Sequence, residues 1–443
     1  MRHKTRIILA GTLGNLIESF DMAICGLLSV YLAKYLTGDA SKGLLIVFAT
    51  FFAGYLARPL GAIVLGLFSD IYGRKITLAA SILSMGIATT LIGFIPSSHS
   101  IGVAAVIILL ILRIIQSFSC GAEYLNSSTY LVENAENSQK GYSGSWASFG
   151  AMSGMLLASI VALTITYATQ IWPEQDWLIW RIPFIMALLG ASIGLYIRLF
   201  IPESMEYIMY YAHHPKPRLH DLVRESVQYI KNHKTKTVYV FILSCLGVTT
   251  TFQIYIYAPT QAHIYGYFTD QQIVISNIIS LLVLLSVFPI IGKLSDIVNR
   301  EKIVISASIG FVLLSQPLFY SLSHSNYTEL LLAQSLIAIP AGAYYATVPV
   351  MLAEMFPLNL RCTVLSSLYS IAASLAAGLT PLLSLLLLKK TNNPMAPTVL
   401  VLVLVTCVLL TIYFKNIKYR RDNIEHFNKD HYVATDKSGI KDN

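Results

Sequence analysis

Long apolar runs separated by short polar links dominate the pattern of this chain. Each run is about twenty residues long, the length that an α-helix needs to cross a hydrocarbon core of about 30 Å. Six runs precede one long polar link and six follow it, near residues 7–33, 43–68, 76–95, 101–124, 144–168, 179–201, 237–262, 271–294, 303–322, 328–352, 363–388 and 395–414. The pattern therefore predicts an all-α membrane protein with twelve transmembrane helices in two pseudo-symmetric six-helix bundles.

The long polar link sets the expected domain organisation. We expect an N-terminal bundle at 1–201, a cytoplasmic linker at 202–236, a C-terminal bundle at 237–414 and a cytoplasmic tail at 415–443. Within the linker, helical spacing of apolar residues predicts an amphipathic segment on the membrane surface. These residues are Leu219, Leu222, Val223 and Val227. The first apolar run is too long for a secretory signal, so we expect it to be retained as the first span.

Composition excludes a water-soluble globular protein. Hydrophobic residues make up 55% of the 443 residues and charged residues only 12%, whereas soluble domains carry about a quarter charged residues. The net charge is +8, but the basic residues lie in short links instead of on one soluble face, so no nucleic-acid partner is expected. They favour the even-numbered links and both ends of the chain, which predicts a multi-pass protein of a bacterial inner membrane with both termini cytoplasmic.

Other chemistry is not indicated by the sequence. The five cysteines are scattered through apolar runs, which favours buried small hydrophobes over a metal site or a disulfide framework. No phosphate-binding loop and no dinucleotide fingerprint occurs, so we expect no enzyme activity, no cofactor and no metal.

Two internal repeats support a duplication of one half. Residues 66–75 (GLFSDIYGRK) recur as residues 292–301 (GKLSDIVNRE). Glu133 is followed after seven residues by Lys140, and Glu354 by Arg361 at the same spacing. Both repeats fall on the same side of the membrane, after the second and fourth helices of each half.

These repeated charges predict a latch between the halves. A carboxylate at the end of one helix can accept hydrogen bonds from free N–H groups at the start of another, and an arginine can pair with a nearby carboxylate. The expected latch residues are Asp70, Arg74, Glu133, Asp296, Arg300, Glu354 and Arg361. The alternative is that these charges are solvated and only set the topology.

The first repeat resembles the G-x-x-x-D-x-x-G-R-[KR] loop of the major facilitator superfamily. Further segments resemble the metabolite:proton symporter family, the group of the proline/betaine, 2-oxoglutarate, citrate and shikimate permeases. They are residues 14–21 (GNLIESFD), 58–61 (RPLG), 113–124 (RIIQSFSCGAEY), 180–184 (WRIPF) and 354–357 (EMFP). Residues 144–150 (GSWASFG) and 377–381 (AGLTP) are similar to the proline/betaine branch. The resemblance implies proton-coupled solute transport by alternating access.

Charged residues inside the spans identify candidate coupling groups. A charge at mid-bilayer costs at least about 2.5–3.5 kcal/mol, so it normally faces a partner or a polar cavity. The deep charges identified from the sequence are Glu18, Asp21, Arg58, Arg113 and Glu123, three negative and two positive, so that one proton would neutralise them. We expect Asp21 or Glu18, with Glu123 as a further candidate, to carry the proton. The alternative is a permanently paired structural cluster, in which Glu123 pairs with Arg58 or Arg113.

The candidate substrate-binding residues combine guanidinium, amide and phenol groups. Arg113 and Arg58 suit a carboxylate, because guanidinium binds it in a bidentate way. Gln116 and Tyr124 share a polar stripe with Arg113.

In the second half, Gln253 and Tyr257 are candidates on the seventh helix. Tyr344 and Tyr345 suit a quaternary ammonium group or ordinary packing. His263 is either a pH-sensitive outer gate or a plain loop histidine.

The sequence therefore predicts a monomeric secondary transporter for a small solute. The favoured function is proton-coupled uptake of a zwitterionic or carboxylate-bearing solute, such as a proline- or betaine-like osmolyte. Two alternatives remain: an organic-acid or metal-chelate carrier or exporter of the same fold, and a membrane receptor without transport.

Overall fold

The computed structural model describes residues 2–38 and 40–415, so the predicted tail lies outside the described residues except for Lys415. Within this part of the chain, twelve helices are long and apolar enough to cross a membrane. The prediction of twelve spans is confirmed.

The N-terminal bundle contains the first six spans. In chain order its elements are α1 (Arg2–Leu27), α2 (Ser29–Thr37), α3 (Ala40–Tyr72), α4 (Arg74–Gly93), α5 (Ser98–Ile101), α6 (Ala104–Ser119), α7 (Glu123–Glu133), η1 (Asn137–Gln139), α8 (Lys140–Ile171), η2 (Pro173–Gln175), α9 (Asp176–Ile179) and α10 (Ile182–Leu199). The fourth span is broken between α6 and α7, at residues 120–122.

The C-terminal bundle repeats this plan after two linker helices. The linker contains α11 (Met205–His213) and α12 (Leu219–Asn232). The bundle contains α13 (Lys234–Phe252), a π-helical turn η3 (Gln253–Tyr257), α14 (Ala258–Tyr265), α15 (Asp270–Ile297), α16 (Arg300–Ser321), α17 (Tyr327–Met355), α18 (Arg361–Thr391) and a last helix, Thr398–Lys415.

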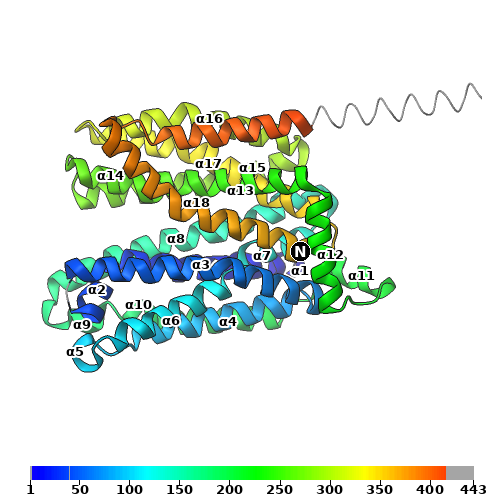
Figure 1. The fold of residues 1–443 in the computed structure, drawn as a ribbon, viewed down its shortest axis with the longest axis horizontal. Coiled ribbons are helices and arrows are strands. Elements are labelled where there is room, and N and C mark those ends of the chain that lie inside the picture. Colours follow the sequence, from blue (N-terminus) through cyan, green and yellow to red (C-terminus); the bar gives the residue numbers. More distant parts are fainter. Residues whose placement is uncertain (1, 39, 416–443) are drawn as a thin grey trace, which may run out of the picture.

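The two bundles lie side by side, with the linker crossing one end of both (Figure 1). We call this end the linker end. Helices α3 and α18 pack together along one contact between the bundles, and α8 and α15 pack together along another. These two contacts are the seams at which the halves meet.

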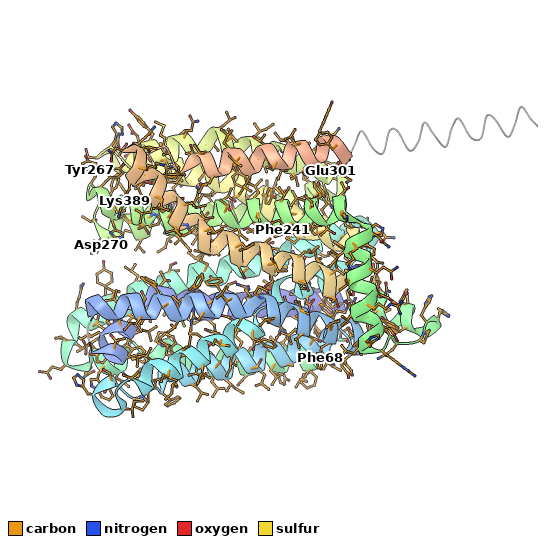
Figure 2. All side chains as sticks on the ribbon, in the orientation of Figure 1. Phe68, Phe241, Tyr267, Asp270, Glu301 and Lys389 are labelled. Atoms are coloured by element: carbon orange, nitrogen blue, oxygen red, sulfur yellow. The ribbon has the colours of Figure 1, made fainter. Side chains whose placement is uncertain are left out.

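Side chains cover both bundles on their outer faces (Figure 2). Many of the outward side chains are large and apolar, for example Leu60, Ile290 and Leu313, which are 61%, 65% and 66% exposed. Such exposure is costly in water but suits contact with lipid, because the surrounding tails are equally apolar. Figure 2 places Asp270 and Lys389 at the end opposite the linker and Glu301 at the linker end.

Candidate functional site

The first helix carries two carboxylates inside the N-terminal bundle. Glu18 and Asp21 of α1 are 4% and 0% exposed. Glu18 Oε1 accepts a hydrogen bond from Arg58 Nη2 of α3 at 3.0 Å. The Arg58 side chain remains 16% exposed and interacts electrostatically with Tyr55 and with Tyr369 of the other bundle. The Glu18–Arg58 pair therefore lies at the α3–α18 seam.

Asp21 lies deeper and has a different environment. Neither of its carboxylate oxygens accepts a hydrogen bond from a residue that the structure describes. The Thr89 hydroxyl lies nearby, but it donates to the Met85 carbonyl at 3.0 Å. The Gln116 amide donates to the backbone carbonyl of Asp21 at 3.2 Å and to the Thr89 hydroxyl at 2.8 Å. A buried carboxylate without hydrogen bonds is costly when it is charged.

Arg113 occupies the other side of Gln116. Its Nη1 donates to Gln116 Oε1 at 2.5 Å, and its guanidinium lies 4.2 Å from the ring centroid of Phe51. Arg113 is only 2% exposed, and no ion pair joins it to a carboxylate among the described residues. Gln116 thus connects an unpaired arginine with the backbone of an unpaired aspartate.

Three tyrosines meet at mid-span between the bundles. The rings of Tyr124 and Tyr369 have centroids 5.4 Å apart. The Ser148 hydroxyl donates to the Tyr345 carbonyl at 2.7 Å and lies 2.8 Å from the Tyr124 hydroxyl. Because Ser148 has one hydroxyl proton, Tyr124 is the donor in that second bond. We call Tyr124, Tyr345 and Tyr369 the tyrosine cluster.

At the linker end, Asp70 joins the two halves through the start of α18. Its carboxylate accepts hydrogen bonds from the backbone N–H groups of Thr363 and Cys362, at 2.8 and 3.3 Å, and from the Thr363 hydroxyl at 2.7 Å. Arg74 Nη1 lies 3.3 Å from Asp70 Oδ1. The first turn of a helix offers free N–H groups and a positive dipole end, so a carboxylate is well stabilised there.

Glu133 and Glu206 extend this contact into a network. Glu133 accepts hydrogen bonds from Arg74 at 3.1 Å and from Arg361 of the other bundle at 2.9 Å. Arg361 also donates to Glu206 of α11 at 3.0 Å, and Lys140 donates to Glu206 at 3.0 Å. Burial alone would raise the pKa of Glu206, but the hydrogen bonds from Arg361 and Lys140 outweigh it and lower the pKa. The linker helix is thus bonded to both bundles.

The second repeat has the same geometry at the α8–α15 seam. Asp296 accepts hydrogen bonds from the backbone N–H groups of Gly141 and Tyr142 at the start of α8, at 2.6 and 2.9 Å. Arg300 pairs with Asp296 at 3.6 Å and with Glu354. The Arg300 side chain is 17% exposed whereas that of Arg74 is fully buried, so the second contact is the more hydrated one.

The described hydrogen bonds between the bundles lie at the linker end and at mid-span. The mid-span bonds are Ser148 to Tyr345, Ser366 to Asn126 at 3.2 Å and Ser374 to the Tyr55 carbonyl at 3.1 Å. Among the described residues, none joins the bundles at the opposite end. The linker end is therefore the closed end.

Comparison with known proteins identifies the family. The model of the "Sugar (and other) transporter" family matches residues 8–218, and that of the Major Facilitator Superfamily matches residues 241–434. The proline/betaine transporter of Escherichia coli strain K12 is 32% identical over 419 residues, which cover 92% of this chain and 82% of that relative. The chain belongs to the major facilitator superfamily.

Other members of the superfamily agree with this assignment. The glycine betaine/proline/ectoine/pipecolic acid transporter OusA of Dickeya dadantii is 30% identical over 417 residues, covering 92% of this chain and 82% of the relative. A solved structure of the proton:xylose symporter XylE superposes with a TM-score of 0.73 at 17% identity, covering 93% of this chain and 96% of that one. The latter likeness concerns the fold. As a member of the superfamily, the chain is a multi-pass membrane transporter of small solutes and not an enzyme.

One buried charge of this transporter was missed from the sequence. Arg198, near the end of α10, is 1% exposed, and its guanidinium pairs with Glu123 and donates to the Leu78 carbonyl. The alternative in which Glu123 pairs with Arg58 or Arg113 is therefore corrected: its partner is Arg198. With Arg198 included, the three carboxylates of Glu18, Asp21 and Glu123 are matched by the three arginines Arg58, Arg113 and Arg198, so the expected excess negative charge disappears. An arginine inside the sixth apolar run was the available signal, and its long side chain reaches back into the bundle.

The polar stripe of the fourth span and the position of His263 differ from what the sequence predicts. The polar stripe does not continue from Arg113 and Gln116 to Tyr124, because the fourth span is broken at residues 120–122. Tyr124 instead faces the seam. His263 lies in the last turn of α14, not in a loop; its Nδ1 is 3.2 Å from Asp270 Oδ1 at the start of α15, and half of its side chain is exposed.

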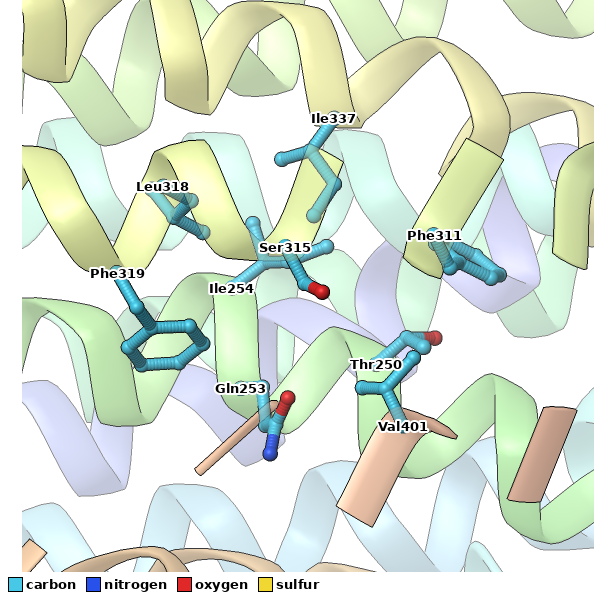
Figure 3. A pocket seen from close by; sticks show the side chains of 9 residues that line it. All are labelled: Thr250, Gln253, Ile254, Phe311, Ser315, Leu318, Phe319, Ile337 and Val401. Carbon is cyan, nitrogen blue, oxygen red and sulfur yellow. The ribbon is translucent and has the colours of Figure 1, made fainter. Parts of the chain in front are cut away.

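Gln253 and Tyr257 lie inside the C-terminal bundle, away from the Glu18–Arg58 pair. Gln253 lines a narrow cavity with Thr250, Phe311 and Ser315 (Figure 3), and its amide donates to the Pro397 carbonyl at 2.7 Å. Tyr257 packs against Phe319, with ring centroids 6.0 Å apart. The π-helical turn η3 carries both residues. Tyr344 is similarly internal, since its hydroxyl donates to the Leu243 carbonyl at 2.7 Å.

The start of the linker also contributes residues that sequence reasoning missed. Glu203 accepts hydrogen bonds from the backbone N–H groups of Arg74 and Lys75, at 2.9 and 3.2 Å. Gly73 has φ +108°, and a Cβ there would lie 2.1 Å from Glu203 Oε2. The glycine of the repeated loop is thus required both by its backbone conformation and by the close approach of Glu203. The adjacent acidic segment at 202–206 was the signal.

Proposed function

We propose that this transporter imports a small zwitterionic solute of the proline/betaine type together with protons, by alternating access. It works as a monomer in a bacterial inner membrane, with both termini and the linker end in the cytoplasm. The observation that carries the proposal is the Glu18–Arg58 pair, which lies at the seam beside the tyrosine cluster.

This arrangement offers complementary groups for the two ends of a zwitterion. Arg58 is the partly exposed arginine of the pair, and its guanidinium suits a carboxylate. The rings of Tyr124 and Tyr369 present π-faces that attract an ammonium group. The names of the Escherichia coli and Dickeya dadantii relatives include proline and betaine, which supports this substrate class.

The structure changes which arginine we favour for binding. Arg113 is nearly fully buried behind Phe51 and Gln116, so a solute would reach it only after these groups move. Arg58 already faces the seam. We therefore assign the substrate carboxylate to Arg58 and leave Arg113 to the coupling site.

Proton coupling is assigned to Asp21. Its carboxylate lacks hydrogen bonds among the described residues and is buried, so a proton relieves the cost of its charge. Gln116 accepts a hydrogen bond from Arg113 and donates one to the backbone carbonyl of Asp21, so the unpaired arginine belongs to the same polar cluster as the carboxylate and offsets the charge that remains when Asp21 loses its proton. Glu123 is a poorer carrier, because Arg198 already neutralises it.

The closed linker end corresponds to the outward-facing state under this topology. The Asp70, Glu133 and Asp296 contacts must then break before the solute reaches the cytoplasm. These contacts are charge-assisted hydrogen bonds, which are stronger than neutral ones, and they join the two bundles at helix ends, so they suit a latch.

Charge balance favours a second candidate, a symporter for a monocarboxylate anion. The three carboxylates and three arginines inside the N-terminal bundle sum to zero, so one proton and one monoanion would cross without net charge. One proton and a zwitterion would instead carry one positive charge.

Uptake into proteoliposomes distinguishes the two candidates. Labelled proline, glycine betaine, a monocarboxylate and a dicarboxylate are offered with and without an inward proton gradient. We expect gradient-driven uptake of proline or betaine that an interior-negative potential stimulates. Uptake of the monocarboxylate alone, without response to the potential, would favour the second candidate. Uptake of all solutes without any response to the proton gradient would overturn the coupling proposal.

A further inference from the structure

Linker helix α12 has an exposed face that no other described element covers. The helix crosses the linker ends of the bundles instead of running along them (Figure 1), and it packs against α3, α13 and α18. Leu222 and Ser226 face this packing and are 0% and 6% exposed. A helix in this position lies at the level where the membrane surface meets the ends of the spans.

The exposed side of α12 combines an apolar stripe with basic groups. Leu219, Val223 and Val227 follow each other at four-residue intervals and are 54%, 42% and 46% exposed. Val223 and Val227 of this stripe also line a shallow groove of about 440 Å³, together with Arg224 and Lys231. Four-residue spacing keeps such residues on one face of a helix.

Two basic side chains of this face are without an acidic partner among the described residues. Neither Arg224 nor Lys231 forms an ion pair with a residue that the structure describes, and His220 lies at the same groove. The acidic Asp221 is 3.7 Å from His220. An apolar stripe flanked by unpaired basic side chains is the pattern of a helix that sits in the headgroup region of an acidic bilayer.

We propose that α12 is a binding surface for acidic phospholipids. The apolar stripe enters the boundary between headgroups and acyl chains, and Arg224 and Lys231 hold the lipid phosphates. The proposal concerns a part of the chain distinct from the transport pathway and does not depend on the identity of the solute. Because α12 packs on α3 and α18, the bound lipid stabilises the same end of the seam that Asp70 closes.

The test measures hydrogen–deuterium exchange of residues 219–232 in the full-length protein. The protein is placed in nanodiscs of phosphatidylcholine with increasing phosphatidylglycerol. We expect exchange in α12 to slow as phosphatidylglycerol increases. The double variant R224Q/K231Q should need about 25-fold more acidic lipid for the same protection, because each basic residue near a membrane surface contributes about 1 kcal/mol, or about fivefold.

The matched control is K389Q/K390Q, which removes two exposed basic residues at the opposite end of the C-terminal bundle. This variant should keep the wild-type response of α12. Equal exchange of α12 in both lipids for the wild type would overturn the proposal. An unchanged response of α12 to phosphatidylglycerol in R224Q/K231Q would also overturn it. A weakened response in K389Q/K390Q would overturn it as well, because the effect would then depend on the overall charge of the protein and not on α12.

Discussion

The carboxylate of Asp70 in one bundle accepts a hydrogen bond from the backbone N–H of Thr363 in the other at 2.8 Å. Asp70 is fully buried, and its second oxygen receives the N–H of Cys362 at 3.3 Å. A side chain near the end of α3 therefore serves as the anion at the start of α18. This contact closes the linker end because separating the bundles would expose the carboxylate and the helix start together.

Asp70→Asn should weaken the closed linker end. Hydrogen bonds to a charged group contribute about 1.5–3 kcal/mol, so the closed population should fall by about tenfold or more relative to the open one. Double electron–electron resonance between spin labels at Tyr72 and Asn359 measures the separation. Asp270→Asn, in the exposed first turn of α15 at the opposite end, is the control. An unchanged distance distribution in Asp70→Asn would leave the loop with a topological role only.

Gly14→Ala should destabilise the N-terminal bundle. A Cβ at this position would lie 1.8 Å from Arg198 Nη2, so the guanidinium must move away from Glu123 and leave its charge unpaired. We expect a loss of about 1–3 kcal/mol, as for other overpacked sites, measured as a lower midpoint of thermal unfolding. Gly26→Ala on the same helix is the control, since a Cβ there meets nothing within 4 Å. Equal midpoints for the two variants would contradict the packing argument.

Arg58→Lys should raise the apparent substrate KM by about tenfold, equivalent to about 1.4 kcal/mol, with a smaller change in turnover. The substitution keeps the positive charge but removes the bidentate geometry for a carboxylate. Arg113→Lys, changed in the same way, should instead alter the dependence of uptake on the proton gradient. Initial rates over a range of solute concentrations measure both. The assignment fails if Arg113→Lys raises KM and Arg58→Lys does not.

Asp21→Asn should abolish accumulation driven by a proton gradient while exchange of internal for external solute continues. Asparagine resembles the protonated carboxylate in shape but cannot release a proton. Uptake and counterflow in the same proteoliposomes provide the measurement, and Glu174→Gln in the exposed turn η2 is the control. Wild-type accumulation by Asp21→Asn would remove Asp21 from the coupling site.

The stabilisation that Glu206 contributes through Arg361 and Lys140 should not depend on pH across the neutral range. The pKa of Glu206 is lowered from its ordinary value of 4.5, so its stabilising contribution is complete above about pH 4.5 and is lost as the pH falls through the lower value of the folded state. The difference in unfolding midpoint between the wild type and Glu206→Gln should therefore be constant from about pH 8 to pH 5 and shrink only in stronger acid. A difference that disappears near pH 6 would contradict this assignment.

Much of the architecture followed from the sequence alone. Lipid requires long apolar helices, because backbone groups must be bonded within each span, so the twelve runs were visible directly. The repeated loops at 66–75 and 292–301 showed that the halves are related. Charges inside apolar runs are rare enough to stand out, which is why Glu18, Asp21 and Arg113 were found.

The tertiary structure decided the partners of those charges. Spacing along one helix shows which residues share a face, but it does not show which helix faces them or how far a long side chain reaches. In the folded chain, Arg198 forms the ion pair with Glu123. Arg58 pairs with Glu18 at the seam. Gln116 lies between Arg113 and the backbone of Asp21. The break at residues 120–122 turned Tyr124 toward the other bundle, and the π-helical turn carries Gln253 and Tyr257 inside their own. Such choices depend on packing between helices distant in the chain, and that packing alone placed the linker's Glu206 between the two halves.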